Sequence, residues 1–118
     1  MQKSILIVED EFLIALDLKY ILEGHGWRVM GPVASVDSAL RMLVDELPTV
    51  ALLDVNLGRE LVTPVAEVLR SHNVPFALAS AYERPEQFGG DIFAGVPNVG
   101  KPTGERRLLS VLAQLVRP

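Results

Sequence analysis

The chain has 118 residues, 49% of them hydrophobic and 22% charged, which predicts one folded domain spanning residues 1–118 with a packed core. Eleven basic against fifteen acidic residues give a formal net charge of −4, which disfavours direct binding to nucleic acid. The sequence has no cysteine. Disulfides, thiolate metal sites and cysteine nucleophiles are therefore excluded, and a reducing compartment, the cytoplasm, is expected.

The amino end of the chain leads directly into an apolar run at residues 4–8. Such a run is typical of a strand buried on both faces, and not of a signal peptide. Residues 11–23 then place apolar side chains at helical spacing, with Phe12, Leu16 and Tyr20 on one line. All uninterrupted apolar runs in the chain are too short to cross a bilayer, so we expect no membrane association.

The rest of the chain repeats this alternation of apolar runs and amphipathic stretches. Ser35 or Asp37 can cap the second helix, and Thr63-Pro64 is a good start for the third, with Thr63 as its cap. The adjacent glycines Gly89-Gly90 weaken the helical pattern around them, so this fourth helix should be short or mobile. In total we expect further strands at 28–34, 50–53, 75–79 and 96–99, and further helices at 35–46, 63–72, 85–94 and 105–117.

Five successive strand–helix units predict a parallel sheet with helices on both faces. Right-handed crossovers leave few topologies for such a chain. The simplest is an α/β flavodoxin-like fold, a doubly wound (βα)5 three-layer sandwich with the strand order 2-1-3-4-5. Functional groups in such sheets gather at the carboxyl ends of the strands, so the residues that follow the apolar runs form the candidate site.

Polar side chains stand at the ends of four of the five expected strands. The first strand is followed by Glu9 and Asp10, the third by Asp54, the fourth by Ser80 and the fifth by Lys101. Carboxylates about 4 Å apart repel one another by roughly 4 kcal/mol at a surface-like dielectric, so the acids need a counter-charge. Mg²⁺ favours such oxygen ligands and also binds phosphoryl groups. An aspartate can attack a phosphoryl group as a nucleophile, and lysine and serine can stabilise its oxygens.

Four segments, "ILIVEDE", "LLDVNLG", "ALASAYE" and "GKPT", resemble the signature segments of the response-regulator receiver (CheY-like) domain. They occur in the family's order and cover essentially the whole chain. The resemblance implies a phosphorelay receiver of a two-component system. Asp54 would accept a phosphoryl group from a sensor histidine kinase or a histidine phosphotransfer protein. Ser80 would be the switch hydroxyl, and Lys101 would contact the phosphate.

The same resemblance implies a magnesium site and a mode of output. Glu9, Asp10 and Asp54 would hold Mg²⁺ together with the backbone carbonyl of Asn56, and Glu11 would face outward. A cis peptide bond before Pro102 is also implied. Phosphorylation would change the conformation of the domain, which would signal by contact with an output protein. A homodimer through the face of strand 4, helix 4, strand 5 and helix 5 is a further implication.

The sequence departs from the family pattern in three places: at Asn98, in the fourth helix, which "FGGD" weakens, and between Asp54 and Ser80, where the chain looks shortened. The family usually has Tyr or Phe three residues before the lysine, where this chain has Asn98, so the usual coupling of hydroxyl and aromatic switch is in doubt. The segment "VPFALASAY" resembles a subgroup of alphaproteobacterial single-domain receivers that carry a PFxFxTGY-type fourth strand.

Two other classes of function fit parts of the pattern. A pseudo-receiver, a scaffold that works without phosphorylation, would fit Asn98 and the weak fourth helix, but an unused acidic cluster would be destabilising. A phosphatase of the haloacid dehalogenase type also uses an aspartyl nucleophile. It would have a second aspartate where this chain has Asn56. The acids after the first strand, taken alone, would also suit the positive end of a helix dipole.

Overall fold

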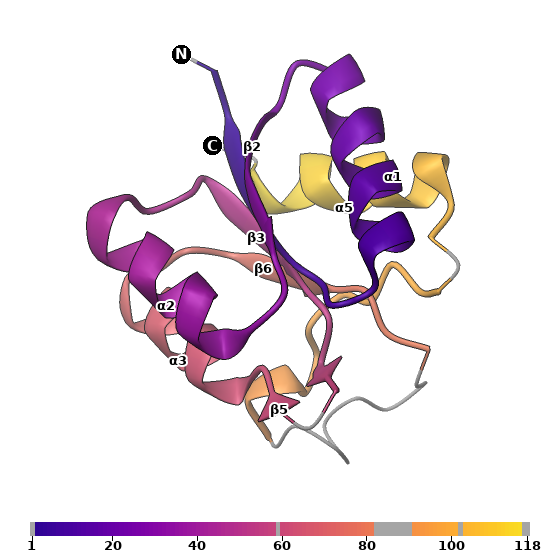
Figure 1. Ribbon diagram of the computed structural model, residues 1–118. Coiled ribbons are helices and arrows are strands. Elements are labelled where there is room, and N and C mark those ends of the chain that lie inside the picture. The colour runs from indigo at the N-terminus through magenta and orange to yellow at the C-terminus, as the bar shows by residue number, and fades with distance from the viewer. Residues whose placement is uncertain (1, 59, 82–90, 102, 117–118) are drawn as a thin grey trace.

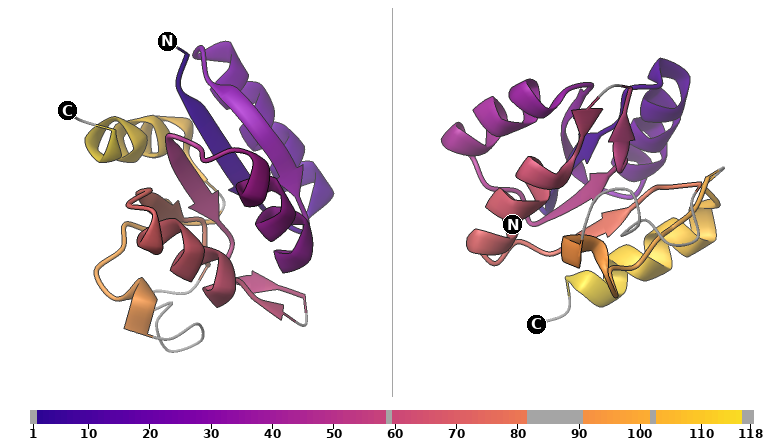
Figure 2. Two further views of the ribbon diagram at one scale, coloured as in Figure 1. Left: turned by 90° about the vertical axis from the view of Figure 1, so that its left-hand side faces the viewer. Right: turned by 90° about the horizontal axis from the view of Figure 1, so that it is seen from below.

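The computed structural model describes residues 2–58, 60–81, 91–101 and 103–116, which form three layers (Figure 1). The middle layer is a parallel sheet in the order β2-β1-β3-β6. Its strands are β1 (Ser4–Val8), β2 (Arg28–Val33), β3 (Val50–Leu53) and β6 (Phe76–Leu78). Helices α1 (Phe12–Gly24) and α5 (Glu105–Leu115) cover one face, and α2 (Val36–Asp45) and α3 (Thr63–Ser71) cover the other (Figure 2). The flavodoxin-like architecture is confirmed.

The strands bury alternate side chains into two separate cores. Leu6 and Val8 of β1 join the core under α2 and α3, and Ile5 and Ile7 join the core under α1 and α5. The same alternation holds in β3 and β6. Because successive side chains point to opposite faces of a strand, continuous apolar runs are what a sheet covered on both faces requires. The buried strands fix where the polar residues after them lie.

The helix starts are set by local signals. The Ser35 Oγ accepts a hydrogen bond from the Ser38 N–H at 3.2 Å, which confirms Ser35 as the cap of α2. The prediction of Thr63 as the cap of α3 is wrong by one residue, because the helix begins at Thr63 and Val62 holds the cap position. Pro64 lies in the first turn, where its missing N–H costs no hydrogen bond.

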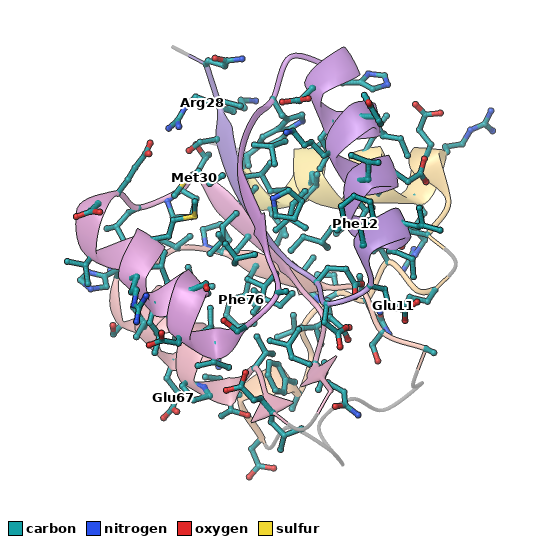
Figure 3. All side chains as sticks on the ribbon, viewed as in Figure 1. Glu11, Phe12, Arg28, Met30, Glu67 and Phe76 are labelled. Carbon is teal, nitrogen blue, oxygen red and sulfur yellow. The ribbon has the colours of Figure 1, made fainter. Side chains whose placement is uncertain are left out.

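The apolar line predicted on α1 is not the face that packs on the sheet. Phe12 and Tyr20 are 74% and 67% exposed, whereas Ala15, Leu18 and Leu22 are buried (Figure 3 labels Phe12 at the start of α1). A helix lying on a sheet buries only one side of its surface, so part of a broad apolar stripe stays in contact with solvent. None of the described helices is long and apolar enough to span a membrane.

The fifth strand is much shorter than predicted. Within the described residues, the segment 96–99 pairs with β6 only at an isolated bridge between Leu78 and Asn98. It still occupies the position next to β6, as the predicted strand order requires. Pro97 has no N–H to donate, and Gly100 has a φ of +81°, so an extended ladder cannot continue on either side.

Three further segments differ from the predicted elements or lie outside the described residues. A short hairpin of β4 (Asn56–Leu57) and β5 (Glu60–Leu61), which the sequence did not predict, lies between β3 and α3. Of the predicted fourth helix, Asp91–Phe93 form one 3-10 turn, and residues 85–90 lie outside the described residues. The predicted cis bond before Pro102 also lies outside them.

Candidate functional site

The fold brings the predicted site residues together at one edge of the sheet. Glu9 and Asp10 follow β1, Asp54 follows β3, and Ser80 follows the end of β6. Glu9, Asp54 and Ser80 are buried, with 3%, 7% and 3% of their surfaces exposed. Polar side chains are rarely buried to this extent unless they have partners, so these three residues need hydrogen bonds or ion pairs to offset their loss of hydration.

Lys101 supplies part of that compensation. Its ammonium Nζ lies 2.8 Å from Glu9 Oε1 and donates a hydrogen bond of 2.9 Å to Asp54 Oδ2. Glu11, which is mostly exposed, lies further away at 3.9 Å. Burial alone would lower the pKa of Lys101, but the hydrogen bonds and charges of Glu9 and Asp54 outweigh it, so the pKa is raised. Lys101 therefore stays charged between the two carboxylates.

One positive charge does not fully satisfy the acids. Burial raises the pKa of Glu9 to about 7, opposed by the hydrogen bonds from Lys101 and the Glu11 N–H and increased by the charge of Asp54. The Oε2 atom accepts the Glu11 N–H at 3.1 Å. The Oε1 atom is buried without a regularly aligned hydrogen bond from the described residues, although the Lys101 ammonium is close. The site is therefore still too rich in negative charge.

The acids are arranged as a divalent cation would require. Carboxylate oxygens of Glu9, Asp10 and Asp54 all lie within 4.8 Å of one another. Three hard oxygen ligands from two neighbouring strand ends, with one buried oxygen poorly satisfied, fit the preference of Mg²⁺ for carboxylates and water. The residues present are thus suited to hold this ion.

The acids open into a cavity of about 290 Å³. The Asn56 N–H donates to Asp54 Oδ1 at 3.2 Å, so one oxygen of Asp54 is held by the backbone and the other by Lys101. The role of the Asn56 carbonyl stays a prediction. The cavity is lined by Asp10, Glu11, Asp54, Asn56, Gly58, Ser80, Ala81 and Lys101.

Asn98 is tied to the site in a way that the sequence did not reveal. Its side-chain Oδ1 accepts the Ser80 N–H at 3.0 Å and the Gly100 N–H at 2.9 Å, and its Nδ2 donates to the Ser80 carbonyl at 3.2 Å. The sequence marked Asn98 only as a departure from the family pattern. The sequence shows that the Asn98 side chain can donate and accept hydrogen bonds, but the groups that it bonds depend on the fold.

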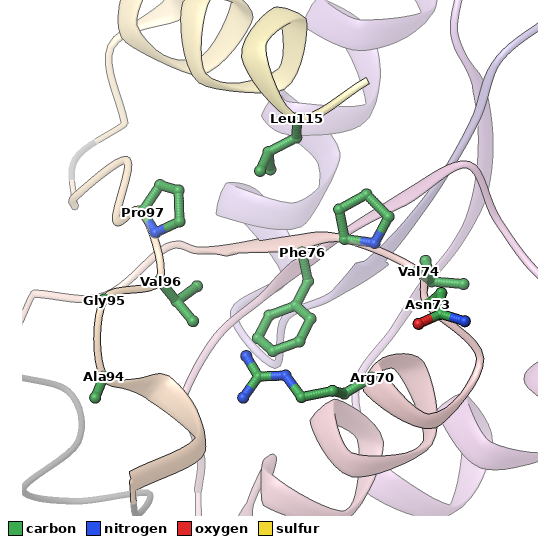
Figure 4. Close-up of a pocket in the computed structure, with 10 residues that line it drawn as sticks. Arg70, Asn73, Val74, Phe76, Ala94, Gly95, Val96, Pro97 and Leu115 are labelled. Atoms are coloured by element: carbon green, nitrogen blue, oxygen red, sulfur yellow. The ribbon is translucent and has the colours of Figure 1, made fainter. Parts of the chain in front are cut away.

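A larger cavity of about 580 Å³ lies at the other end of the sheet, beside the start of β6. Figure 4 shows the Arg70 guanidinium next to the Phe76 ring, and its Cζ is 5.3 Å from the ring centroid. Val96, Pro97 and Leu115 line other parts of the wall (Figure 4). This cavity contains none of the predicted site residues.

No model of a protein family matches the chain. The phyllosphere-induced regulator PhyR of Methylorubrum extorquens is 35% identical over 91 residues, which are 75% of this chain and 33% of PhyR. The chain spans less than half the length of the curated relatives that it matches.

Solved structures resemble the chain over nearly its whole length. The solution structure of SdrG from Sphingomonas melonis Fr1 is 37% identical, with a TM-score of 0.83 and 98% of both chains covered. A BeF3-activated conformation of SdrG, from Pseudomonas melonis Fr1, has 36% identity and a TM-score of 0.79, with 97% of this chain and 96% of SdrG covered. A CheY-like response regulator receiver domain protein from Methanospirillum hungatei JF-1 has 26% identity and a TM-score of 0.83, with 98% and 94% covered.

Proposed function

Because this chain belongs to the family of CheY-like response-regulator receiver domains, we propose that it accepts a phosphoryl group on Asp54 in a two-component phosphorelay. The observation that carries this proposal is the setting of the Asp54 carboxylate. It is buried at a strand end, 2.9 Å from the Lys101 ammonium and within 4.8 Å of oxygens of Glu9 and Asp10. The likeness to PhyR and SdrG agrees with the predicted alphaproteobacterial subgroup.

The proposed reaction is a transfer between two side chains. An Asp54 oxygen forms a bond to phosphorus while the P–N bond to the imidazole of a histidine kinase or histidine phosphotransfer protein breaks. The imidazole leaves with the electron pair of that bond. Lys101 and Ser80 would stabilise the oxygens of the transferred group, since an ammonium and a hydroxyl donor suit this role. Such transfer depends mainly on positioning and charge, which a rigid sheet edge supplies.

We propose that Glu9, Asp10, Asp54 and the Asn56 carbonyl hold Mg²⁺ in this site. When bound, the ion offsets the charge of the acids and of the phosphoryl oxygens. The Asn56 N–H and the Lys101 ammonium orient the Asp54 carboxylate from two sides. The BeF3-activated conformation known for SdrG supports the proposed phosphorylation of Asp54, since beryllofluoride imitates a phosphoryl group on a carboxylate.

Output is proposed to occur by contact with a protein in the cytoplasm. A phosphoryl group on Asp54 would form new contacts with Lys101 and Ser80. These contacts would bias the end of β6 and the neighbouring residues 96–99, the Asn98 segment, toward a second arrangement. The surface around β6, the 3-10 turn, the Asn98 segment and α5 would carry that change to an output partner or to a second copy of the chain.

The test is the intact mass after incubation with acetyl phosphate, with and without Mg²⁺. The wild type should gain one phosphoryl group only with Mg²⁺, and Asp54→Asn should gain none. Asp45→Asn, which removes an exposed acid on α2, is the matched control and should behave as the wild type. If the wild type gains no mass under any condition, the chain is better described as a scaffold that works without phosphorylation.

A further inference from the structure

The ladder between β6 and the Asn98 segment is completed by a side chain. Leu78 donates its N–H to the Pro97 carbonyl at 2.8 Å and accepts the Val99 N–H at 2.7 Å, as in a regular parallel pair. The next residue to pair in this way, two positions beyond Leu78 at the end of β6, would be Ser80. Its backbone groups bond to the Asn98 carboxamide, whose Oδ1 takes the N–H and whose Nδ2 meets the carbonyl.

A carboxamide can replace a peptide group here because it has the same acceptor and donor. The replacement is needed because the chain turns away at Gly100, which has a φ of +81°. The same Oδ1 atom also accepts the Gly100 N–H at 2.9 Å, one residue before Lys101. A single oxygen is therefore bonded to the backbone of Ser80 and to the turn that presents Lys101. The Asn98 carbonyl in turn accepts a hydrogen bond from the α5 residue Arg107 at 3.2 Å.

We propose that Asn98 is a positioning residue that holds Ser80 and Lys101 in fixed register at the cavity that Asp54 lines. This inference rests on the proposed function, since both held residues are the proposed contacts of the phosphoryl group. It gives Asn98 a role that an aromatic side chain could not fill, because Tyr and Phe lack the paired acceptor and donor. Movement of Ser80 on phosphorylation would then reach the turn before Lys101 through the Asn98 carboxamide, and α5 through the Asn98 backbone carbonyl that Arg107 bonds.

The first test needs no phosphorylation and uses backbone NMR of the free protein. Asn98→Leu, of similar volume, removes these three side-chain bonds, and the amide protons of Ser80 and Gly100 should shift upfield and exchange faster together. Asn98→Asp keeps both accepted bonds and should leave these protons protected, while the carbonyl shift of Ser80 changes because its donor is lost. If Asn98→Leu does not fold, Asn98→Asp still tests the proposal, because its loss of the donor should be felt at the Ser80 carbonyl.

Thr103→Val is the matched control. The Thr103 hydroxyl donates to the Gly100 carbonyl at 2.7 Å, so its loss disturbs the same turn without touching Ser80. The Ser80 amide should be unchanged in this variant. Unchanged Ser80 and Gly100 amides in Asn98→Leu, or equal changes in Thr103→Val, would overturn the proposal.

The second test measures the rate of Asp54 phosphorylation by acetyl phosphate across a Mg²⁺ titration that reaches saturation. Asn98→Leu should lower the maximal rate about tenfold, since small misplacements of stabilising groups are costly. The Mg²⁺ midpoint should stay within about twofold, because no metal-site residue is changed. Ser80→Ala should slow the wild type more than it slows Asn98→Leu, because Ser80 is already misplaced in the latter.

Additive effects of the two substitutions would contradict the positioning role, as would a loss of Mg²⁺ affinity that matches the loss of rate. A wild type that is never phosphorylated would defeat the proposed function, and the NMR comparison would still decide whether Asn98 holds Ser80 and Gly100 together.

Discussion

The free-energy cost of burying acids in the site falls mainly on Glu9. Its carboxyl is buried beside Asp54, and its pKa is raised from 4.5 to about 7. Between these values the folded protein binds more protons than the unfolded chain. Without metal, the contribution of Glu9 to the free energy of unfolding is therefore fully present below pH 4.5 and is lost as the pH rises through about 7. As the pH rises across this window, we expect the free energy of unfolding of Glu9→Gln to increase relative to that of the wild type.

Urea denaturation in EDTA, from about pH 4.5 to about pH 8, would measure this difference. Glu23→Gln, at an exposed position on α1, is the control and should run parallel to the wild type. A constant gap between Glu9→Gln and the wild type over the whole range would show that Glu9 does not titrate as its burial requires.

Strand β2 depends on a glycine whose conformation other residues rarely adopt. Gly31 has a φ of +91°, and a Cβ there would lie 2.7 Å from the Val33 nitrogen and 3.2 Å from the Ile7 carbonyl oxygen. It lies where the register between β1 and β2 shifts. Gly31→Ala should destabilise the fold by about 2 kcal/mol or more, from backbone strain and from the clash with main-chain atoms.

Chemical denaturation would test the Gly31 prediction, with Gly24→Ala as its control. Gly24 ends α1 with an ordinary φ, and a Cβ added there would meet no neighbouring atom of the described residues within 4 Å. Alanine at this position should therefore be neutral or stabilising by up to about 1 kcal/mol. Equal stabilities of the two variants would mean that β2 relaxes around an added methyl group.

Elements with a strong pattern were predictable, and those that depend on neighbours were not. The acids after β1 and β3 could be placed because buried apolar runs mark the strands that carry them. The hairpin β4–β5 has strands of two residues, too short for any periodicity to show. The exposure of Tyr20 and the bonds of Asn98 depend on which surfaces meet in the fold, and local sequence does not contain that information.

At the scale of the whole molecule, the two cores hold the acids in place against their own repulsion. The apolar strands end at the same edge, so the energy of packing both faces of the sheet is what keeps Glu9, Asp10 and Asp54 together. A cation that binds only this arrangement must stabilise the entire fold. Measuring how Mg²⁺ changes the stability of the protein therefore tests the metal site without a phosphoryl donor.

We expect Mg²⁺ to raise the melting temperature of the wild type and not that of Asp10→Asn. At about 100 times Kd, the ion would add about 2.7 kcal/mol, or roughly 10 °C for a domain of this size. In EDTA the order should reverse, with Asp10→Asn more stable than the wild type because one of three clustered charges is gone. The gain should shrink at about pH 6, where Mg²⁺ must displace the proton that Glu9 then carries.

Differential scanning fluorimetry across a Mg²⁺ titration, at about pH 6 and about pH 8, would follow these shifts, with Asp45→Asn again as the control. If Asp45→Asn and Asp10→Asn responded alike, the stabilisation would come from general screening of an acidic protein. Only a response that requires Asp10 and strengthens as Glu9 ionises would mean that the three acids bind the ion as one site, because screening depends on net charge and not on which carboxylate is removed.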